Sequence, residues 1–379
     1  MPKPPGLFKW CPLVLAGLLA FGFTAAAQDP EPRVAEPDPP SVHLPPAQSL
    51  PAHALVPQAR STFEWTFHKT ADNRHPDGIE QQMVWLMNRA RGDPSWEGDW
   101  LATLENENVA RARSYFNVDL SLLRDEFDAI PAKPPAAFDV RLYWAARAHS
   151  DYLIANDIQD HTDQLERVEA EGFSYRSWRG NVFSYTLDGI HAHAGFNIDW
   201  GEGDGTGMQP DRGHRQAIMS MDGDYTNVGL AVVAENDAAT DVGPLVTTGN
   251  YASADTRQAD HFNRFLVGTV WRDRNQNERY DPGEGTGGVT VRPEPAFYYA
   301  VTSASGGYAI PLLEAGTYAV SFSGSELSDD TTRTVRVGDR SVLLDLLVDG
   351  QTPDTDDATA QSPDSSANGG GCFIGVAYR

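Results

Sequence analysis

Residues 77–94 read DGIEQQMVWLMNRARGDP, and this stretch decides how the first half of the chain folds. Asp77 and Glu80 have the spacing of a helix capping box, in which each side chain accepts a hydrogen bond from the other residue's backbone. Apolar residues then recur on one helical face, at Ile79, Met83, Leu86 and Ala90. A Gly-Asp-Pro sequence at 92–94 ends the pattern. The sequence therefore predicts a helix that opens a globular domain at residue 77.

The rest of this domain mixes helix and strand signals. A second helix is predicted from Asp139, with its apolar face at Leu142, Ala146, His149 and Leu153. Stretches rich in β-branched residues, 228–233 and 245–248, predict strands. We therefore expect an α+β unit over residues 77–258. Because His149 lies on an apolar helix face, we interpret it as a core histidine that bonds a backbone carbonyl, and not as a metal ligand.

Beyond residue 261 the sequence changes to short β-branched and aromatic segments broken by Gly, Pro, Ser and Asp. Such spacing without helical periodicity predicts a small β-sandwich, here over residues 264–349. The expected strands are 265–271, 289–291, 299–301, 308–310, 317–322 and 332–337. The predicted fold class is thus α+β with a second, all-β domain.

Length and charge narrow the classes of protein and partner. The chain has 379 residues and 40% hydrophobic content, which suits two folded units and excludes full disorder. Its 29 Lys and Arg against 53 Asp and Glu leave a net charge of −24. A chain this acidic is poorly suited to phosphates or anionic lipid head groups, so we expect no nucleic-acid partner.

The N-terminus has the layout of a secretory signal. Lys3 and Lys9 precede an apolar run at 13–23, and three alanines at 25–27 form an A-x-A cleavage site. We therefore expect a signal peptide over residues 1–27 and a secreted or cell-surface protein. The apolar run is shorter than the ~20 residues that cross a bilayer, so no transmembrane span is expected in the mature chain.

Two further segments have the composition of unfolded chain. Prolines predict an extended spacer over residues 28–76, and Asp, Ser, Thr and Gly predict a disordered acidic tail over 350–379. With Cys11 in the removed signal, Cys372 is alone in the mature chain, which excludes a disulfide framework. The end at 369–374 resembles the CFI-box of some exported bacterial proteins. Modification or processing at Cys372 and a passive chain end both stay open.

The most specific metal signal lies at residues 273–284. Oxygen donors occupy positions 1, 3, 5, 9 and 12 and a backbone carbonyl position 7, which is the register of an EF-hand calcium loop. These residues are Asp273, Asn275, Asn277, Arg279 (through its carbonyl), Asp281 and Glu284. Glu278 replaces the usual glycine at position 6, and the strand-like stretch 266–271 precedes the loop. We therefore expect a calcium loop on a β-sandwich instead of a helix–loop–helix, with an ordinary turn as the alternative.

Several stretches of the first domain carry a family resemblance. They are EQQMVWLMNRAR at 80–91 with Asp93-Pro94, AARAHSD at 145–151, His161, GHR at 213–215, VGL at 228–230 and VTTGNY at 246–251. In this order they resemble bacterial CAP domains, the superfamily of cysteine-rich secretory proteins, antigen 5 and plant pathogenesis-related class 1 proteins. The resemblance covers roughly residues 77–255 and implies an α-β-α sandwich.

The resemblance also implies a cleft with two histidines and two acids. His161 and His214 match the histidines, and Asp199 matches the second acid by its spacing from an aromatic residue. Gly180 stands where the first glutamate is expected. Two imidazoles, one carboxylate and water make a reasonable zinc set, so the resemblance implies zinc at these three residues, with surface histidines as the alternative. His193 is the reserve ligand.

The second domain has a resemblance of its own. Residues 267–273, 281–284 and 287–291, SASGGY at 303–308 and AGTY at 315–318 resemble the SdrD B-like and Cna B-like repeats of bacterial surface proteins. Such repeats act as stalks and spacers. The resemblance therefore agrees with a calcium loop and implies a spacer role.

Two classes of function stay open at this point. One is a non-enzymatic extracellular module that binds an ion and a lipid, sterol, peptide or cell-wall component. The other is a metal-dependent hydrolase, with a peptide substrate, that uses His161 and His214. The missing glutamate at Gly180 favours the first, because it removes the residue best placed to act as general base.

Overall fold

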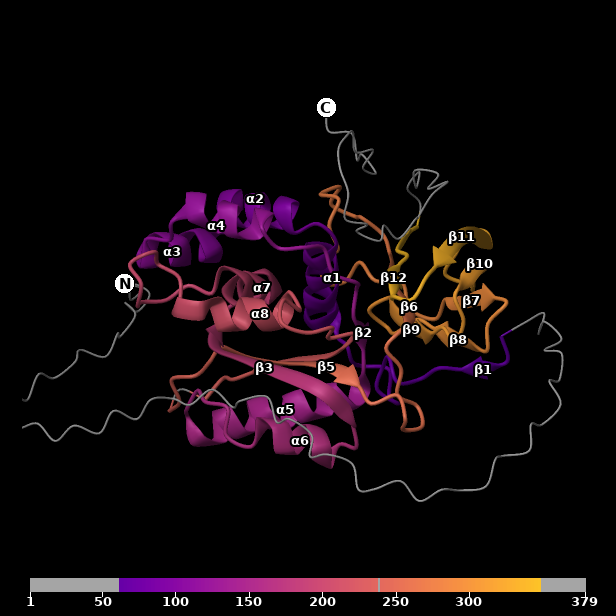
Figure 1. Cartoon of the computed structure of the whole chain (residues 1–379), viewed down its shortest axis with the longest axis horizontal. Helices are drawn as coiled ribbons and strands as arrows, with labels where there is room; N and C mark the ends of the chain where they lie inside the picture. Colours follow the sequence, from indigo (N-terminus) through magenta and orange to yellow (C-terminus); the bar gives the residue numbers. More distant parts are fainter. Residues whose placement is uncertain (1–60, 238, 349–379) are drawn as a thin grey trace, which may run out of the picture. The chain divides into compact units, whose positions relative to one another are not determined.

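The computed structural model describes residues 61–237 and 239–348, and all of them fall within one structural unit (Figure 1). The expected signal peptide, most of the expected spacer, and the expected tail with Cys372 lie outside the described residues. No helix in the described part of the chain has the length and apolar character needed to cross a membrane.

A four-stranded sheet forms the centre of the first part. Its order is β2-β4-β5-β3, with β2 and β4 parallel and the other pairs antiparallel. The strands are β2 (Ala137–Phe138), β3 (Tyr175–Thr186), β4 (Asn227–Ala234) and β5 (Leu245–Ala254). Both strands that the sequence predicts in this domain, at 228–233 and 245–248, are confirmed.

Helices lie on both faces of this sheet (Figure 1). They are α1 (Gly78–Gly92), α2 (Pro94–Thr103), α3 (Glu107–Phe116), α4 (Leu120–Asp128), α5 (Val140–Asn156), α6 (Gln164–Ala170), α7 (Gly189–Ile198) and α8 (Gly213–Ile218), with a 3-10 turn at Pro210–Arg212. Helices α5 and α6 lie on one face, and α7 and α8 lie on the other. The three layers form the α+β fold that the sequence predicts. Asp139 caps α5, as its sequence pattern indicates.

Helix α1 begins where the capping box predicts. The Asp77 carboxylate accepts hydrogen bonds from the backbone N–H groups of Ile79 and Glu80, and the Glu80 carboxylate accepts one from the N–H of Asp77. The burial of α1 differs from the prediction of one apolar face, because Gln81 and Gln82 are buried as well. Both glutamines donate hydrogen bonds to the second, all-β part of the chain, which packs against this side of α1.

The second part consists of two sheets. One has the order β1-β8-β7-β10-β11, and in the other β6 pairs with β9, β12 and β13. The strands are β1 (Phe63–Glu64), β6 (Phe265–Trp271), β7 (Thr290–Glu294), β8 (Tyr298–Val301), β9 (Gly307–Pro311), β10 (Gly316–Ser323), β11 (Thr331–Val337), β12 (Val342–Leu343) and β13 (Leu346–Leu347). Each of the six predicted strands overlaps an observed one. Residues from both sheets contribute to one hydrophobic core.

Residues 61–76, which the sequence assigns to the spacer, include a strand and buried side chains. Phe63 and Glu64 of β1 pair in parallel with β8, and Trp65 is only 3% exposed within an aromatic and aliphatic cluster that includes Phe67. Aromatic residues alternate at 63, 65 and 67, which is a weak strand signal. The pairing partner of β1 lies more than 200 residues away, so local sequence does not reveal it.

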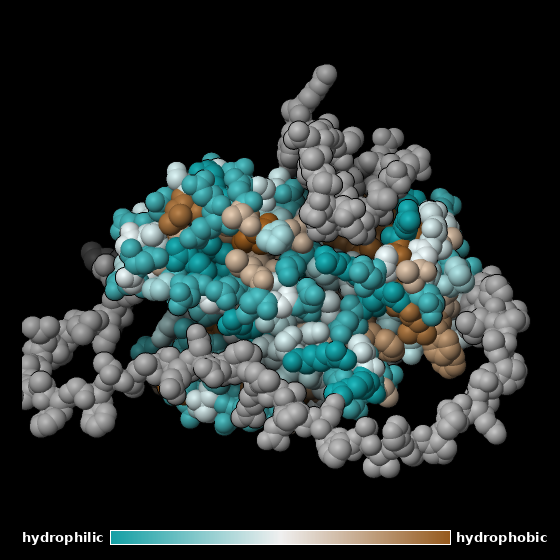
Figure 2. Space-filling model, in the orientation of Figure 1, coloured by the Kyte–Doolittle hydropathy of each residue, from teal (hydrophilic) through white to brown (hydrophobic). Residues whose placement is uncertain are grey.

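The face shown in Figure 2 is mostly hydrophilic. Apolar atoms gather over the region of β8 and β1, where the rings of Phe63 and Phe297 stack with centroids 4.6 Å apart. These two side chains are 54% and 38% exposed. The edge of the five-stranded sheet thus carries an aromatic pair at the surface.

The two parts of the chain pack together along α1. Trp271 of β6 lies edge-on to Trp85 of α1, with 5.9 Å between ring centroids, and both belong to one hydrophobic cluster. The Trp85 indole N–H donates to Asp345 Oδ2 at 3.1 Å, and Gln81 Nε2 donates to Thr269 Oγ1 at 2.9 Å. The boundary predicted between residues 258 and 264 therefore separates two sequence regions that share a core.

Candidate functional site

His214 and Asp199 form a hydrogen-bonded pair. The Asp199 carboxylate accepts a hydrogen bond from the His214 backbone N–H at 2.9 Å, and its other oxygen lies 2.7 Å from His214 Nδ1. Because a carboxylate only accepts, Nδ1 carries a proton, and in the neutral form of the ring the lone pair lies on Nε2. The Asp199 side chain is 0% exposed and the His214 side chain 23%. The imidazole therefore reaches solvent while a buried carboxylate orients it.

Local sequence explains this geometry. Asp199 follows the last residue of α7 with a φ of 56°, in the left-handed region that Asp enters more readily than most residues. Phe196 lies one turn earlier, and its ring stacks on that of His214 with centroids 5.9 Å apart. The spacing of Phe196 and Asp199 thus places both the carboxylate and the aromatic support of the ring.

His161 has a different partner. Its Nδ1 lies 2.7 Å from the side-chain oxygen of Gln164, the first residue of α6. Gln164 is fully buried, and its Nε2 donates to Asn250 Oδ1 at 3.0 Å and to the Gly249 carbonyl at 3.2 Å. Because the amide N–H groups are used in this way, the Gln164 oxygen accepts from His161. The exposed His161 ring therefore also keeps its lone pair on Nε2.

Gln164 occupies the space that the expected glutamate would need. A Cβ built on Gly180 of β3 would lie 2.6 Å from both the oxygen and the nitrogen of the Gln164 amide. Residue 180 carries no acid, and the neutral amide of Gln164 occupies the space beside it. Sequence reasoning identified Gly180 but missed Gln164, because the contact joins α6 to β3 and leaves no local pattern.

We expect Gly180→Glu to lower the free energy of unfolding by about 1–3 kcal/mol, the usual cost of overpacking a filled site. The new side chain must displace the buried amide of Gln164. Urea unfolding of the full chain measures the effect. The control is a double-mutant cycle with Gln164→Ala, in which Gly180→Glu should cost less free energy of unfolding when Gln164 is already alanine. An equal cost of Gly180→Glu in the wild type and in Gln164→Ala would mean that residue 180 does not meet Gln164.

The structure does not bring the three expected zinc ligands into one group. In the described part of the chain, no hydrogen bond or ring contact joins His161 to His214 or Asp199, and their ligand atoms do not all lie within 4.8 Å of one another. Both Asp199 oxygens accept from His214. Asp199 therefore positions an imidazole and is not placed as a ligand.

Two other histidines have structural roles. His149 is fully buried, and its Nε2 lies 2.9 Å from the Asp160 carbonyl, which confirms the prediction of a core histidine. Burial lowers the pKa of His149 to about 4. His193 is also fully buried, and its Nε2 lies 2.9 Å from Glu97 Oε1. The choice of His193 as reserve ligand was wrong, because the ring is enclosed in the core and already paired.

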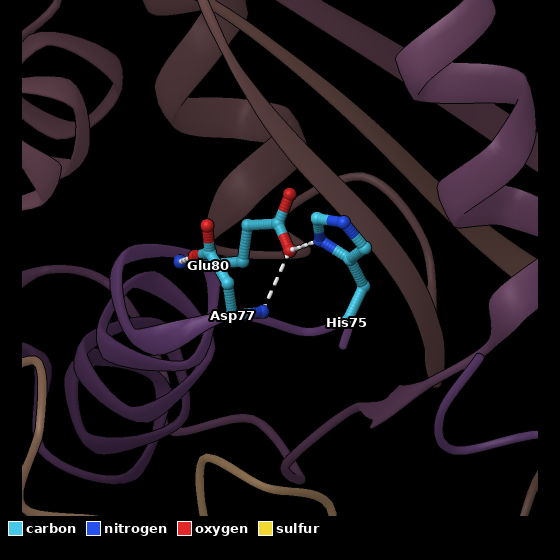
Figure 3. Close-up of side chains that lie close together, drawn as sticks. All are labelled: His75, Asp77 and Glu80. Atoms are coloured by element: carbon cyan, nitrogen blue, oxygen red, sulfur yellow. Dashed lines mark hydrogen bonds and ion pairs between the residues drawn. The ribbon is translucent and has the colours of Figure 1, made fainter. Parts of the chain in front are cut away.

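His75, Asp77 and Glu80 are, among the residues that the structure describes, the group whose potential metal-ligand atoms all lie within 4.8 Å of one another (Figure 3). Glu80 Oε2 accepts from the Asp77 backbone N–H and lies 2.8 Å from His75 Nδ1. That hydrogen bond raises the pKa of His75. Because the Asp77 carboxylate caps α1 and Glu80 accepts from the Asp77 N–H, the group forms an extended capping box.

The first half of the predicted calcium loop, residues 273–284, folds around Asp273. Its two carboxylate oxygens accept from the backbone N–H groups of Asn277 at 3.1 Å and Glu278 at 2.8 Å. Glu278, at position 6, has a φ of 60°, the conformation for which glycine is usual at this position. The loop follows strand β6 directly, which confirms that it is not part of a helix–loop–helix.

The second half of the loop folds around two further acids. Glu284 accepts from the backbone N–H groups of Arg274 at 2.9 Å and Asp281 at 2.8 Å. Asp281 Oδ2 accepts from the side-chain amides of Asn275 and Asn277, each at 2.7 Å. Three carboxylates, two amide oxygens and the carbonyl at position 7 make an all-oxygen set of the kind that calcium prefers. The three carboxylates do not form a group within 4.8 Å, so ligation requires these side chains to draw together.

Comparisons with known proteins add little to this geometry. No protein-family model and no curated protein matches the sequence. A solved structure of an extracellular protein containing an SCP domain, from Bacillus anthracis str. Ames, matches with 18% identity and a TM-score of 0.24. The match covers 41% of this chain and 43% of that chain, so it spans less than half of either protein.

Proposed function

We propose that this chain is an exported bacterial protein of the CAP type that acts as a non-enzymatic binding module, with a calcium loop in its all-β part. The order of the family-like stretches between residues 80 and 251 supports the CAP assignment, and the helical layers on both faces of the sheet agree with it. The signal layout at residues 3–27 supports export. The proposed ligand is an extracellular lipid, sterol, peptide or cell-wall component.

The observation that carries the non-enzymatic assignment is the position of Gln164. In the cleft that the family resemblance implies, the first glutamate is the residue best placed to accept a proton from water. Here Gln164 fills the space beside Gly180 and bonds His161, and a neutral amide does not serve as a general base. The remaining acid, Asp199, is buried behind His214.

The two imidazoles support a zinc-binding role. His161 and His214 are each held through Nδ1, which leaves Nε2 to ligate. Partners that hold the second nitrogen of a histidine fix its tautomer and orientation, and they strengthen metal binding. Asp199 and Gln164 have this role in the proposed site.

Zinc titration of the full chain by calorimetry tests this site. We expect binding by the wild type and loss of binding in His161→Ala and in His214→Ala. Asp199→Asn should weaken binding by about 10–100-fold, because it removes the carboxylate that orients His214. His149→Gln serves as a control, since that ring is buried and bonds a backbone carbonyl. Equal zinc binding by all of these proteins would remove the proposed site.

The alternative function is a zinc-dependent hydrolase. The Asp199–His214 pair favours it, because a buried carboxylate bonded to Nδ1 is an arrangement that orients a catalytic imidazole. Incubation of the zinc-loaded protein with a mixture of peptides separates the two functions. Cleavage by the wild type that disappears in His214→Ala would establish the hydrolase, whereas zinc binding without cleavage supports the binding module.

For the loop at residues 273–284 we propose one weak calcium site, with a Kd on the order of 10⁻⁴ to 10⁻³ M, as is typical of extracellular modules. The ligand register and the positive φ of Glu278 support it. The ligands are those named from the sequence: Asp273, Asn275, Asn277, the carbonyl of Arg279, Asp281 and Glu284.

A further inference from the structure

The proposed calcium loop is anchored to the first helix of the other part of the chain. Gln82 of α1 donates from Nε2 to Asp281 Oδ1 at 2.9 Å and to the Tyr280 carbonyl at 3.2 Å. Gln82 is buried, and Asp281 is position 9 of the loop. One carboxylate therefore accepts from the loop's own amides through Oδ2 and from α1 through Oδ1.

Other loop residues reinforce this contact. Tyr280 is 1% exposed and belongs to the same hydrophobic cluster as the buried residues of α1. The Arg279 guanidinium lies 5.8 Å from the ring centroid of Trp100 in α2. A Cβ built on Gly78, at the start of α1, would lie 3.1 Å from Pro282. Arg279, Tyr280 and Pro282 of the loop thus all lie against helices α1 and α2.

We propose that calcium bound in loop 273–284 stabilises the packing of helix α1 against the all-β part, so that the ion couples the two parts of the chain. This inference rests on the proposed calcium site. An ion held by Asp281 restrains the carboxylate that accepts from Gln82, and it also restrains Tyr280 and Pro282 on either side. An ion that binds the loop more tightly when the loop packs against α1 than when it is detached stabilises the packed state.

Linkage makes the effect reciprocal. If calcium stabilises the contact between Asp281 and Gln82, loss of that contact must weaken calcium binding by the same factor. Coupling between sites is commonly about 5-fold or more. The β-sandwich would then stabilise the binding module in a calcium-dependent way. It would not be the independent spacer that its sequence resemblance implies.

Adjacent glutamines provide a matched pair of variants. Gln81 and Gln82 are both buried and both donate across the same interface, but the hydrogen bond of Gln81 goes to Thr269 of β6 and that of Gln82 goes to the loop. Gln82→Met and Gln81→Met each keep a side chain of similar length and remove the amide. Hydrogen exchange of the full chain, with and without saturating calcium, reports on residues 78–92 and 273–284 separately.

We expect calcium to slow exchange in both segments of the wild type and of Gln81→Met, but in the loop alone for Gln82→Met. Calorimetry should show calcium binding to Gln82→Met weakened by about 5-fold or more, with a smaller change in Gln81→Met. Calcium that binds and protects the loop of the wild type without protecting residues 78–92 would overturn the coupling and leave the site intact. Absence of calcium binding to the wild type would overturn the site itself. If Gln82→Met does not fold, the wild-type exchange pattern still tests the coupling, because it shows whether calcium protects residues 78–92.

Discussion

Replacing Tyr280 by alanine should lower the free energy of unfolding by about 3–5 kcal/mol, the range for a large buried aromatic side chain. Tyr280 is 1% exposed and lies in the hydrophobic cluster that holds α1, although it belongs to the all-β part of the sequence. Its loss removes packing that both parts share. Urea unfolding of the full chain, followed by circular dichroism and by tryptophan fluorescence, measures the change.

The control for this substitution is Tyr280→Phe. It keeps the ring and removes only the hydrogen bond that the Tyr280 hydroxyl donates to the Ser305 carbonyl at 3.0 Å. We expect a loss of about 1 kcal/mol, the usual net contribution of one hydrogen bond. A loss below 1 kcal/mol for Tyr280→Ala, or unfolding of the helical part unchanged from the wild type, would show that the two parts do not share a core.

Acid should destabilise the protein through His68. This side chain is 1% exposed, its Nε2 lies 2.9 Å from the Val301 carbonyl, and burial lowers its pKa to about 3. Above pH 6.5 the ring is neutral in both the folded and the unfolded state, so its titration does not change the free energy of unfolding. Below pH 6.5 the unfolded chain binds a proton that the folded chain does not, so stability falls by about 1.4 kcal/mol per pH unit, or about 2 kcal/mol at pH 5.

The variant His68→Gln tests this expectation, because its stability should fall less steeply with pH between 6.5 and 4. His149→Gln makes a useful comparison. Burial lowers the pKa of His149 to about 4, so its contribution to the slope should end roughly one pH unit earlier than that of His68. Stability is measured by urea unfolding at each pH. Plots of the free energy of unfolding against pH that run parallel for the wild type and both variants would contradict the assignment of neutral, buried rings.

Local signals predicted the start and end of α1 and the presence of most strands. Asp77 and Glu80 cap the helix through contacts three residues apart, so sequence alone is sufficient to place them. The burial of Gln82 was not predictable, because its partner Asp281 lies 199 residues away. Strand β1 was missed for the same reason, since two residues of strand depend entirely on a distant partner.

In the candidate site, too, some features could be predicted from the sequence, whereas contacts between distant residues could not. The family resemblance implied an acid at Asp199, and the structure pairs Asp199 with His214. The role of Gln164 depends on the approach of α6 to β3 at Gly180, which no spacing in the sequence encodes. Sequence could name the donors of the proposed calcium loop, because a single segment supplies them all. It could not show that the loop rests on α1.

Calcium titration of the purified full chain by calorimetry tests the central claim most directly, beside the variant Asp273→Ala. Asp273 is position 1 of the loop and makes its hydrogen bonds within residues 273–284, so its loss leaves the contact between Asp281 and Gln82 in place. The account predicts one site with a Kd on the order of 10⁻⁴ to 10⁻³ M in the wild type and no binding in Asp273→Ala. Absence of binding to the wild type, or equal binding by both proteins, would contradict it.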